Sequence, residues 1–341
     1  MSLRTIEWRD GVVVTIDQTK LPTQEVYVEL KTCEDVAYAI KDMKVRGAPL
    51  IGVAAAMGLA LTAFRSKARS RQDLMKELEA SAKLLRETRP TAVNLFWSID
   101  RVLKKAREVE GDVEEVKRLV VEEAKRMADE DVEVNRRIGR NGLKLIRDGY
   151  RVLTHCNAGG LATVGYGTAL GVIRAAFEAG RKIKVIATET RPKLQGARLT
   201  SYELIRDGIP VTLITDSMAG YAMKRGMVDI AIVGADRIVK DAVINKIGTY
   251  TIAVLAKEND VPFYVAAPLS TMDLSRKASE VEIEERDSKE VLFFGPVRIA
   301  PEGVNVWNPA FDVTPMEYVK GIITEVGVLS PDELESKLNA G

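Results

Sequence analysis

The sequence predicts an α/β protein: a mostly helical N-terminal domain with a short β start, followed by a doubly wound parallel sheet in the C-terminal domain. Two observations support this prediction. After Gly149, short apolar stretches alternate with stretches of helical apolar spacing, whereas before it only residues 5–29 alternate as strands do. Short apolar strands that alternate with helices are typical of a parallel sheet covered on both faces.

The N-terminal third begins with the alternating residues 5–29, which predict a small antiparallel β element. Helical spacing starts near Thr32 and is broken by glycine and proline at Arg46-Gly47-Ala48-Pro49. Pro49 then lies near the first turn of a buried, alanine-rich helix, where proline is tolerated. The expected helices after this break cover residues 51–64, 67–87 and 93–109.

A long helix is expected from Val113 to about Ile146, with Asp112 as its N-terminal cap. A helix of this length usually connects or supports domains. We therefore place the domain boundary within it, near Arg126, which gives an N-terminal domain of residues 1–126 and a C-terminal domain of residues 127–341.

The C-terminal domain is expected to alternate strands and helices. Candidate strands are 152–154, 183–188, 211–214, 230–233 and 263–266. Candidate helices are 163–179, 195–207, 218–224 and 247–257. For the first of these, a pattern of small residues that is typical of a helix already starts at Leu161. The charged stretch from Asp273 to Arg298 is expected to be an irregular excursion.

Composition excludes several classes of function. Lys and Arg total 50 against 49 Asp and Glu, so no overall field favours nucleic acid or an anionic membrane. Two cysteines, Cys33 and Cys156, and the single histidine His155 exclude a disulfide framework and a zinc site of the usual kind. With no signal peptide and no run of transmembrane length, we expect a cytoplasmic protein.

Ligands of open α/β sheets bind at the carboxyl ends of the strands. This rule selects three stretches: His155-Cys156, Glu189 to Pro192, and Gly234 to Arg237. Asp236 either presents a carboxylate at this edge, caps a helix or pairs with Arg237. Cys156 gains thiolate character from a helix that starts directly after the Asn157–Gly160 turn, or loses it in an apolar pocket; the residues leave both open.

His155 is not expected to be the base for Cys156, because adjacent residues of a strand point to opposite faces. A packing or hydrogen-bonding role is the better interpretation. The segment Gly165-Tyr166-Gly167 is no dinucleotide fingerprint, since it does not open a helix in the required spacing.

Four cationic places favour a phosphorylated small molecule. Arg46-Gly47-Ala48 offers a guanidinium beside a helix start, and Asn245-Lys246 an ammonium beside another. Arg89 and Arg191 each precede a proline, which restrains their backbone.

Six motifs resemble the methylthioribose-1-phosphate isomerases, which belong to the superfamily of the α, β and δ subunits of initiation factor 2B. They are RGAPLIGVAAA (46–56), TRPTAVNLFW (88–97), THCNAGGLATVGYGTALGVI (154–173), ETRPKLQGARLT (189–200), GADRI (234–238) and NKIGTY (245–250). The resemblance covers nearly the whole chain. It implies a helical domain with a Rossmann-like domain, a homodimer, and neither metal nor nucleotide cofactor.

The resemblance also assigns the site residue by residue. The catalytic cysteine matches Cys156 and the catalytic aspartate Asp236. Substrate contacts match Arg46, Gly47, Ala48, Arg89, Gln195, Asn245 and Lys246. The implied reaction is the aldose–ketose isomerisation of 5-methylthioribose 1-phosphate in methionine salvage, with aspartate as proton donor and cysteine assisting hydrogen transfer.

Two alternatives remain open. One is an isomerase of ribose 1,5-bisphosphate in nucleotide breakdown, which needs a cationic subsite for a second phosphate. The other is a non-catalytic regulatory subunit of the initiation-factor-2B kind. The presence of both Cys156 and Asp236 at strand ends argues against the second.

Overall fold

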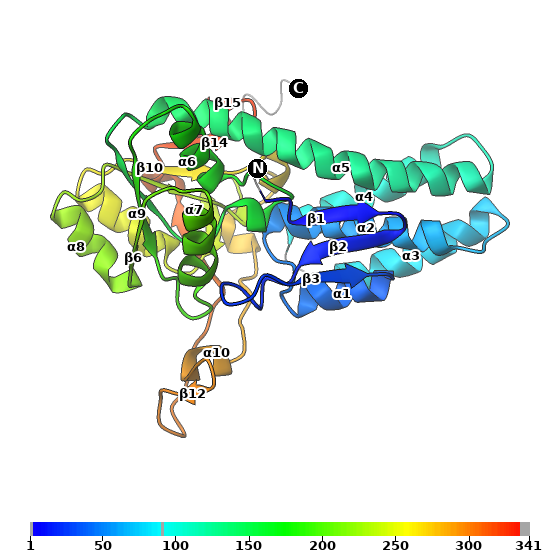
Figure 1. Ribbon diagram of the computed structural model, residues 1–341, viewed down its shortest axis with the longest axis horizontal. Helices are drawn as coiled ribbons and strands as arrows, with labels where there is room; N and C mark the ends of the chain where they lie inside the picture. The colour runs from blue at the N-terminus through cyan, green and yellow to red at the C-terminus, as the bar shows by residue number, and fades with distance from the viewer. Residues whose placement is uncertain (1–2, 90–91, 335–341) are drawn as a thin grey trace.

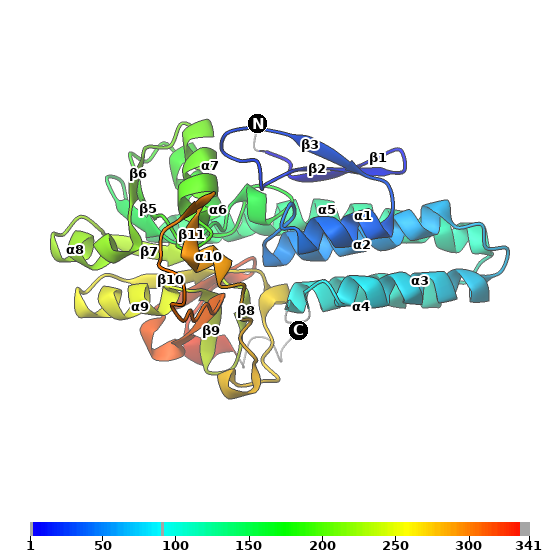
Figure 2. The ribbon, with the colours of Figure 1, turned by 90° about the horizontal axis from the view of Figure 1, so that it is seen from below.

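The computed structural model describes residues 3–89 and 92–334 of the chain. A mostly helical N-terminal half and a C-terminal half built on a large sheet lie side by side along the long axis of the molecule (Figures 1 and 2). The mixed α/β class predicted from the sequence is confirmed.

The N-terminal half consists of a small antiparallel sheet laid over a layer of helices (Figure 2). The sheet has the order β1 (Ile6–Arg9), β2 (Val12–Ile16), β3 (Tyr27–Leu30), which confirms the predicted β start. The helices are α1 (Cys33–Lys41), α2 (Ala48–Arg65), α3 (Arg71–Arg86), α4 (Val93–Glu108) and α5 (Val113–Gly142).

Helix α2 is the centre of this half and packs against α4 and α5. Its residues are almost all apolar and mostly buried, as the alanine-rich pattern predicts. By length and composition alone α2 could cross a membrane, but here it is the buried core helix of the N-terminal half.

Helix α5 starts as predicted, with the side chain of Asp112 accepting a hydrogen bond from the Glu115 N–H. It ends at Gly142 rather than near Ile146, and Arg181 donates to the carbonyl oxygen of the next residue, Leu143. Along its length the packing changes partner: side chains up to Val132 join the N-terminal core, and those from Val134 join a core under the large sheet. We keep the domain boundary near Arg126, before this change, as a proposal.

The C-terminal half is built on a seven-stranded sheet with the order β15-β14-β10-β7-β4-β5-β6. All its strands are parallel except the edge strand β15. The strands are β4 (Arg151–Thr154), β5 (Lys184–Thr188), β6 (Val211–Ile214), β7 (Ile230–Val233), β10 (Phe263–Ala266), β14 (Gly321–Thr324) and β15 (Gly327–Leu329). The five predicted strands are all present within one residue of their expected bounds.

The helices of this half are α6 (Ala169–Glu178), α7 (Ser201–Arg206), α8 (Ala219–Lys224) and α9 (Thr249–Glu258). The prediction of a helix that starts at Leu161 or Thr163 is wrong for the residues before Ala169, where α6 begins. Gly167 interrupts it with a φ of 85°, and a Cβ at this position would lie 2.4 Å from the Cα of Gly159. The predicted helix 195–207 begins with a π-helical turn, Gly196–Thr200, before α7.

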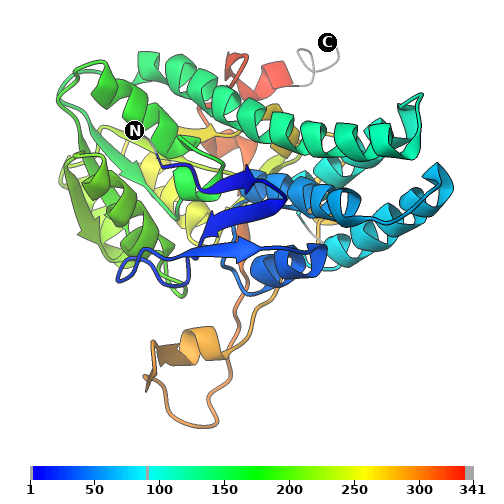
Figure 3. The same cartoon turned by 45° about the vertical axis from the view of Figure 1, so that its right-hand side comes forward.

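The stretch expected to be irregular forms an arm that projects from the body (Figures 1 and 3). Its tip carries α10 (Lys289–Leu292) and the hairpin β11 (Phe293–Phe294) and β12 (Val297–Arg298). A second small sheet, β13-β9-β8, lies beside its base and consists of β8 (Arg237–Ile238), β9 (Ala242–Lys246) and β13 (Phe311–Pro315).

Candidate active site

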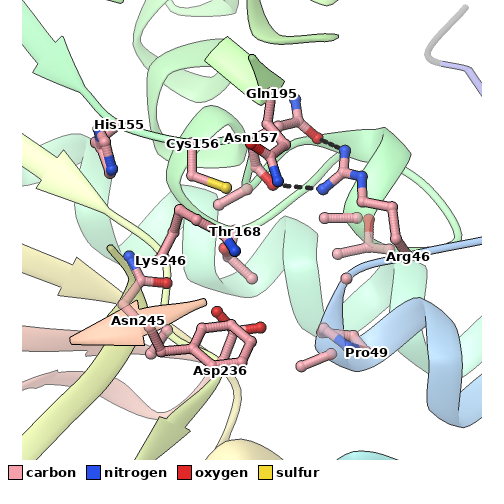
Figure 4. Close-up of a pocket in the computed structure, with 18 of the residues that line it drawn as sticks. Arg46, Pro49, His155, Cys156, Asn157, Thr168, Gln195, Asp236, Asn245 and Lys246 are labelled. Atoms are coloured by element: carbon pink, nitrogen blue, oxygen red, sulfur yellow. Dashed lines mark hydrogen bonds between the residues drawn. The ribbon is translucent and has the colours of Figure 1, made fainter. Parts of the chain in front are cut away.

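The site lies where the strand order of the large sheet reverses. Strands β4 and β7 are neighbours, but the chain leaves β4 towards β5 on one side and β7 towards β10 on the other. Such a switch point opens a crevice at the carboxyl ends of the two strands. His155 and Cys156 follow β4, and Asp236 lies three residues after β7, so the sheet brings the predicted pair to one pocket (Figure 4).

Cys156 is held in a strained conformation at the pocket wall. Its φ is 61°, in the left-handed region that residues other than glycine rarely adopt. Two threonines fix it: its N–H donates to Thr190 Oγ1 at 2.9 Å, and Thr200 Oγ1 donates to its carbonyl at 2.6 Å. Strain that is held in place by neighbouring groups is typical of functional residues.

Burial decides the question that the sequence left open for this thiol. It raises the pKa of Cys156, and the opposing charges of Lys246 and Arg46 do not offset it. Directly after the turn lies only a single 3-10 turn, Gly160–Ala162, and the α-helix α6 begins at Ala169. The thiol is therefore protonated at neutral pH, while the charges of Lys246 and Arg46 favour the thiolate.

His155 is a hydrogen-bonding residue in the pocket wall, as predicted. Nε2 lies 2.8 Å from the carbonyl oxygen of Ile247, which can only accept, so Nε2 carries the proton. Nδ1 then accepts from Thr188 Oγ1 at 2.6 Å. Burial lowers the pKa of the imidazole, so this neutral form persists. His155 thus ties β4 to β5 and to the segment before α9.

Asp236 contributes its carboxyl group to the pocket wall. Its backbone N–H donates to the carbonyl of Ile244, while the neighbouring Arg237 lies 3.8 Å from the carboxylate of Asp273. Burial raises the pKa of Asp236, although Lys246 and Arg89 act in the opposite direction. A carboxyl group that stays protonated is the form that can donate a proton to a sugar oxygen.

Lys246 is the last residue of β9, and β9 is held by β13. Its Nζ donates to the carbonyl of Ala310 at 2.8 Å and lies 4.6 Å from the ring centroid of Phe311. Burial lowers the pKa of this ammonium group. The Asn245 side chain donates to Thr249 Oγ1 at 2.9 Å, so both residues are fixed before a ligand arrives.

The N-terminal half supplies the opposite wall through Arg46, Gly47 and Ala48. Arg46 is buried and donates to Gln18 Oε1 at 2.8 Å. It also donates to the Asn157 carbonyl at 2.9 Å and to Asn157 Oδ1 (Figure 4). Gly47, with φ at 101°, precedes α2, and a Cβ there would lie 2.6 Å from the Cα of Ala162. Only glycine lets the start of α2 approach the loop after β4 this closely.

Two atoms of the predicted contact residues lack partners. Arg89 Nη2 pairs with Glu284 Oε2 at 3.0 Å, but the buried Nε of Arg89 has no hydrogen bond within the described part of the chain. The same holds for Oε1 of Gln195, whose residue is 4% exposed. Buried polar groups without partners are costly, so both atoms are suited to contacting a ligand that carries donors and acceptors.

Sequence reasoning missed the residues that hold this geometry. The Oδ1 atom of Asn157 accepts a hydrogen bond from Arg46, and its Nδ2 donates to Glu203 Oε1 at 2.9 Å. Glu203 also accepts from Gly160 N at 2.7 Å and from Arg174 Nη2 at 2.7 Å. A buried acid on a helix has no sequence signal that separates it from a surface residue. Its position in space alone identifies it.

Arg191, proposed with the anion-binding residues, lies elsewhere. Its guanidinium donates to the carbonyl of Val291 at 3.0 Å and lies 5.9 Å from the ring centroid of Phe294. It does not line the pocket but supports the arm.

Cations, apolar walls, and the thiol and carboxyl groups whose pKa values burial raises therefore surround one pocket of about 70 Å³. Within residues 3–89 and 92–334, no group of three or more His, Cys, Asp and Glu side chains is placed to hold a metal ion. Fold and site together define a Rossmann-like α/β protein whose pocket is suited to a small, anionic, hydroxylated ligand.

Comparison with known proteins identifies the family. Residues 44–331 match the model of the initiation factor 2 subunit family. The methylthioribose-1-phosphate isomerase of Geotalea uraniireducens is 57% identical over 100% of this chain and 99% of its own length. The chain belongs to the initiation factor 2 subunit family and, within it, to the methylthioribose-1-phosphate isomerases.

Solved structures agree on the fold. The 5-methylthioribose 1-phosphate isomerase of Pyrococcus horikoshii has a TM-score of 0.93 at 47% identity, covering 99% of this chain and 96% of that one. A structure from A. fulgidus named translation initiation factor eIF-2B, subunit delta, has a TM-score of 0.87 at 55% identity, with 97% of each chain covered. Structures with isomerase and initiation-factor names thus share this fold.

Proposed function

We propose that this chain converts 5-methylthioribose 1-phosphate to 5-methylthioribulose 1-phosphate, an aldose–ketose isomerisation of methionine salvage. The observation that carries the proposal is the pair Cys156 and Asp236 at the switch point, both with pKa values raised by burial. The isomerases named above, similar over nearly their whole length, support the choice of substrate.

Ring opening is the first difficulty of this reaction, because a phosphate on the anomeric oxygen blocks the spontaneous opening that free aldoses undergo. Asp236 supplies what is missing. Burial raises its pKa and so favours the acid form, which donates a proton to the ring oxygen as the bond between this oxygen and C1 breaks.

Hydrogen transfer follows. Cys156 Sγ removes the proton from C2 and returns it to C1, while the proton of the C2 hydroxyl passes to the carboxylate that ring opening leaves on Asp236. C2 thereby becomes the ketone carbon and the acid form of Asp236 is restored. This step needs the thiolate, and Lys246 and Arg46 are the groups whose charges favour it against burial.

Binding falls to the remaining side chains. Arg46, Arg89 and Lys246 hold the phosphate and the negative charge that develops, and Gln195 and Asn245 contact the hydroxyls. Apolar residues of the pocket wall receive the methylthio group: Pro49, Ala158, Pro268 and Phe311.

The test is turnover of 5-methylthioribose 1-phosphate beside ribose 1,5-bisphosphate, followed by NMR of the product ketose. We expect turnover of the first and little of the second. Preference for the bisphosphate would replace the substrate and retain the catalytic pair.

Turnover of neither substrate would contradict an isomerase activity and favour the alternative hypothesis of a non-catalytic regulatory subunit. That hypothesis requires a stable complex with an initiation-factor GTPase, which a pull-down with the purified GTPase measures. We expect no complex.

We also propose that the chain acts in the cytoplasm and that it forms a homodimer. The dimer is supported by an apolar surface at the free edge of the large sheet, where Leu213 of β6 and Met218 and Tyr221 around α8 are exposed. Sedimentation equilibrium that gives the mass of one chain would contradict the dimer.

A further inference from the structure

A second cavity opens directly beside the catalytic pocket. It measures about 320 Å³ and shares Met43, Arg46 and Gln195 with the smaller pocket. Its walls come from the loop after β2, the end of α1, the loop after β5 and the base of the arm. We call this cavity the vestibule. A ligand that leaves the catalytic pocket past Arg46 and Gln195 enters it.

The vestibule is lined by five cations against one acid. The cations are Lys41, Arg46, Lys193, Arg198 and Arg286. The acid is Asp42, which lies 3.7 Å from the ammonium group of Lys44.

Two of these cations have only neutral partners among their hydrogen bonds in the described residues. Arg46 donates to the side-chain amide oxygens of Gln18 and Asn157 and to the backbone carbonyl of Asn157. Arg198 donates to backbone carbonyls, among them those of Gln18 at 2.9 Å and Leu21 at 2.9 Å. Carbonyl oxygens fix the direction of a guanidinium but leave its positive charge uncompensated.

The base of the arm brings in the other cations. Arg286 pairs with Glu290 at 2.7 Å and with Glu284 at 2.9 Å, and Lys193 lies 3.5 Å from Glu290. Glu290 and Glu284 do not line the vestibule, so the cationic sides of these pairs face the cavity. This gives the charged excursion between Asp273 and Arg298 a function in the shape of the entrance.

Charge concentrated in a concave wall acts on a dianion more strongly than the same charge on a flat surface, because low-dielectric walls focus the field. The whole chain carries a net charge of only +1, so the vestibule is a local feature rather than part of an overall basic surface.

We propose that the vestibule is an anion-binding subsite that captures the phosphate of the sugar phosphate before it passes Arg46 and Gln195 into the catalytic pocket. The inference rests on the proposed function, since it takes its ligand from that reaction. Lys41 and Lys193 act only here, because neither lines the catalytic pocket.

The experiment compares the wild type with the double variant Lys41→Gln/Lys193→Gln. We measure kcat and kcat/KM for 5-methylthioribose 1-phosphate at ionic strengths of about 0.01 M and about 0.5 M. At low ionic strength kcat/KM is expected to fall roughly three- to tenfold, with kcat unchanged. At high ionic strength the two proteins are expected to converge, because the added salt screens the field.

The matched control is Lys67→Gln/Lys125→Gln, which removes the same charge from two exposed lysines of the N-terminal half. An equal loss in this control, an equal kcat/KM in wild type and vestibule variant at low salt, or a parallel fall in kcat would each overturn the subsite.

Calorimetric titration with inorganic phosphate at low salt repeats the comparison without turnover. Weaker binding by the vestibule variant than by the control supports the subsite, and equal binding overturns it. Absence of turnover in the wild type counts against the proposed function alone.

Discussion

The two halves of the molecule contribute different chemistry to one pocket. The N-terminal half delivers Arg46 and Arg89, cations for which we propose a role in binding and none in proton transfer. The C-terminal half delivers Cys156, Asp236 and Lys246. Burial shifts the pKa values of these three groups so that their uncharged forms are favoured. The comparison shows what a parallel sheet adds: at its switch point, loops from two neighbouring strands hold titratable groups away from water.

The largest expected effect tests the C-terminal side. Asp236→Asn keeps the shape of the side chain but removes the proton that opens the ring, so kcat is expected to fall by about 10²–10⁴. The pKa of Asp236 is raised, so the active acid form is lost as the pH rises through it. The wild type should therefore show a falling limb of kcat with pH that the variant lacks. Full turnover in the variant would contradict the acid role.

Glu203→Gln tests the buried hydrogen-bond network that holds the C-terminal part of the site in place. Glu203 is 1% exposed and pairs with Arg174, so neutralising it leaves a buried guanidinium with less compensation. The free energy of unfolding is expected to fall by about 3 kcal/mol, measured by urea denaturation. Because Glu203 also orients Asn157, KM should rise as well. Unchanged stability and unchanged KM together would mean that the network is not required.

Arg46→Lys tests the N-terminal side. A lysine keeps the charge but cannot reproduce the guanidinium contacts with Gln18 and Asn157. We expect KM for 5-methylthioribose 1-phosphate to rise about 10- to 100-fold, with a smaller change in kcat. Steady-state kinetics measures both constants, and a loss confined to kcat would place Arg46 in the proton chemistry and break the comparison.

The smallest effect concerns α5, which joins the two halves. Burial raises the pKa of Asp131 from 3.8 to about 7. A raised pKa means that the folded state binds the proton more tightly, so this contribution to stability is complete below pH 3.8 and is lost as the pH rises through about 7.

Asp131→Asn keeps an acceptor for the N–H of Val164 but no longer titrates. Between about pH 5 and about pH 7 its melting temperature should fall by roughly 1–3 °C less than that of the wild type. Calorimetry at the two pH values measures this, and parallel curves for the two proteins would assign the proton to another group.

The fold was predictable because its signals are local. Short apolar strands between helical stretches predict the parallel sheet, and Asp112 predicts the start of α5. The start of α6 was not predictable from local spacing. Gly167 packs against Gly159, eight residues earlier, and this contact replaces the helix that small residues would otherwise form.

The site was predictable where strand ends define it. The rule for open sheets selects Cys156 and Asp236, and the resemblance adds the contact residues that line the same pocket. What escaped were partners far apart in the chain. Glu284, which holds Arg89, is 195 residues away from it, and nothing in the spacing of either residue indicates the other. Arg191 shows the reverse error, since a Pro-flanked arginine next to the site supports the arm instead.

The most direct test of this division of roles is a single-turnover measurement at saturating 5-methylthioribose 1-phosphate for Cys156→Ser beside Arg46→Lys. If Cys156 transfers hydrogen and Arg46 binds, as we propose, the rate constant falls by about 10²–10⁴ in the first variant and by less than about tenfold in the second. Wild-type rate in Cys156→Ser, or the larger loss in Arg46→Lys, would contradict the claim that the chemistry belongs to the carboxyl edge of the sheet.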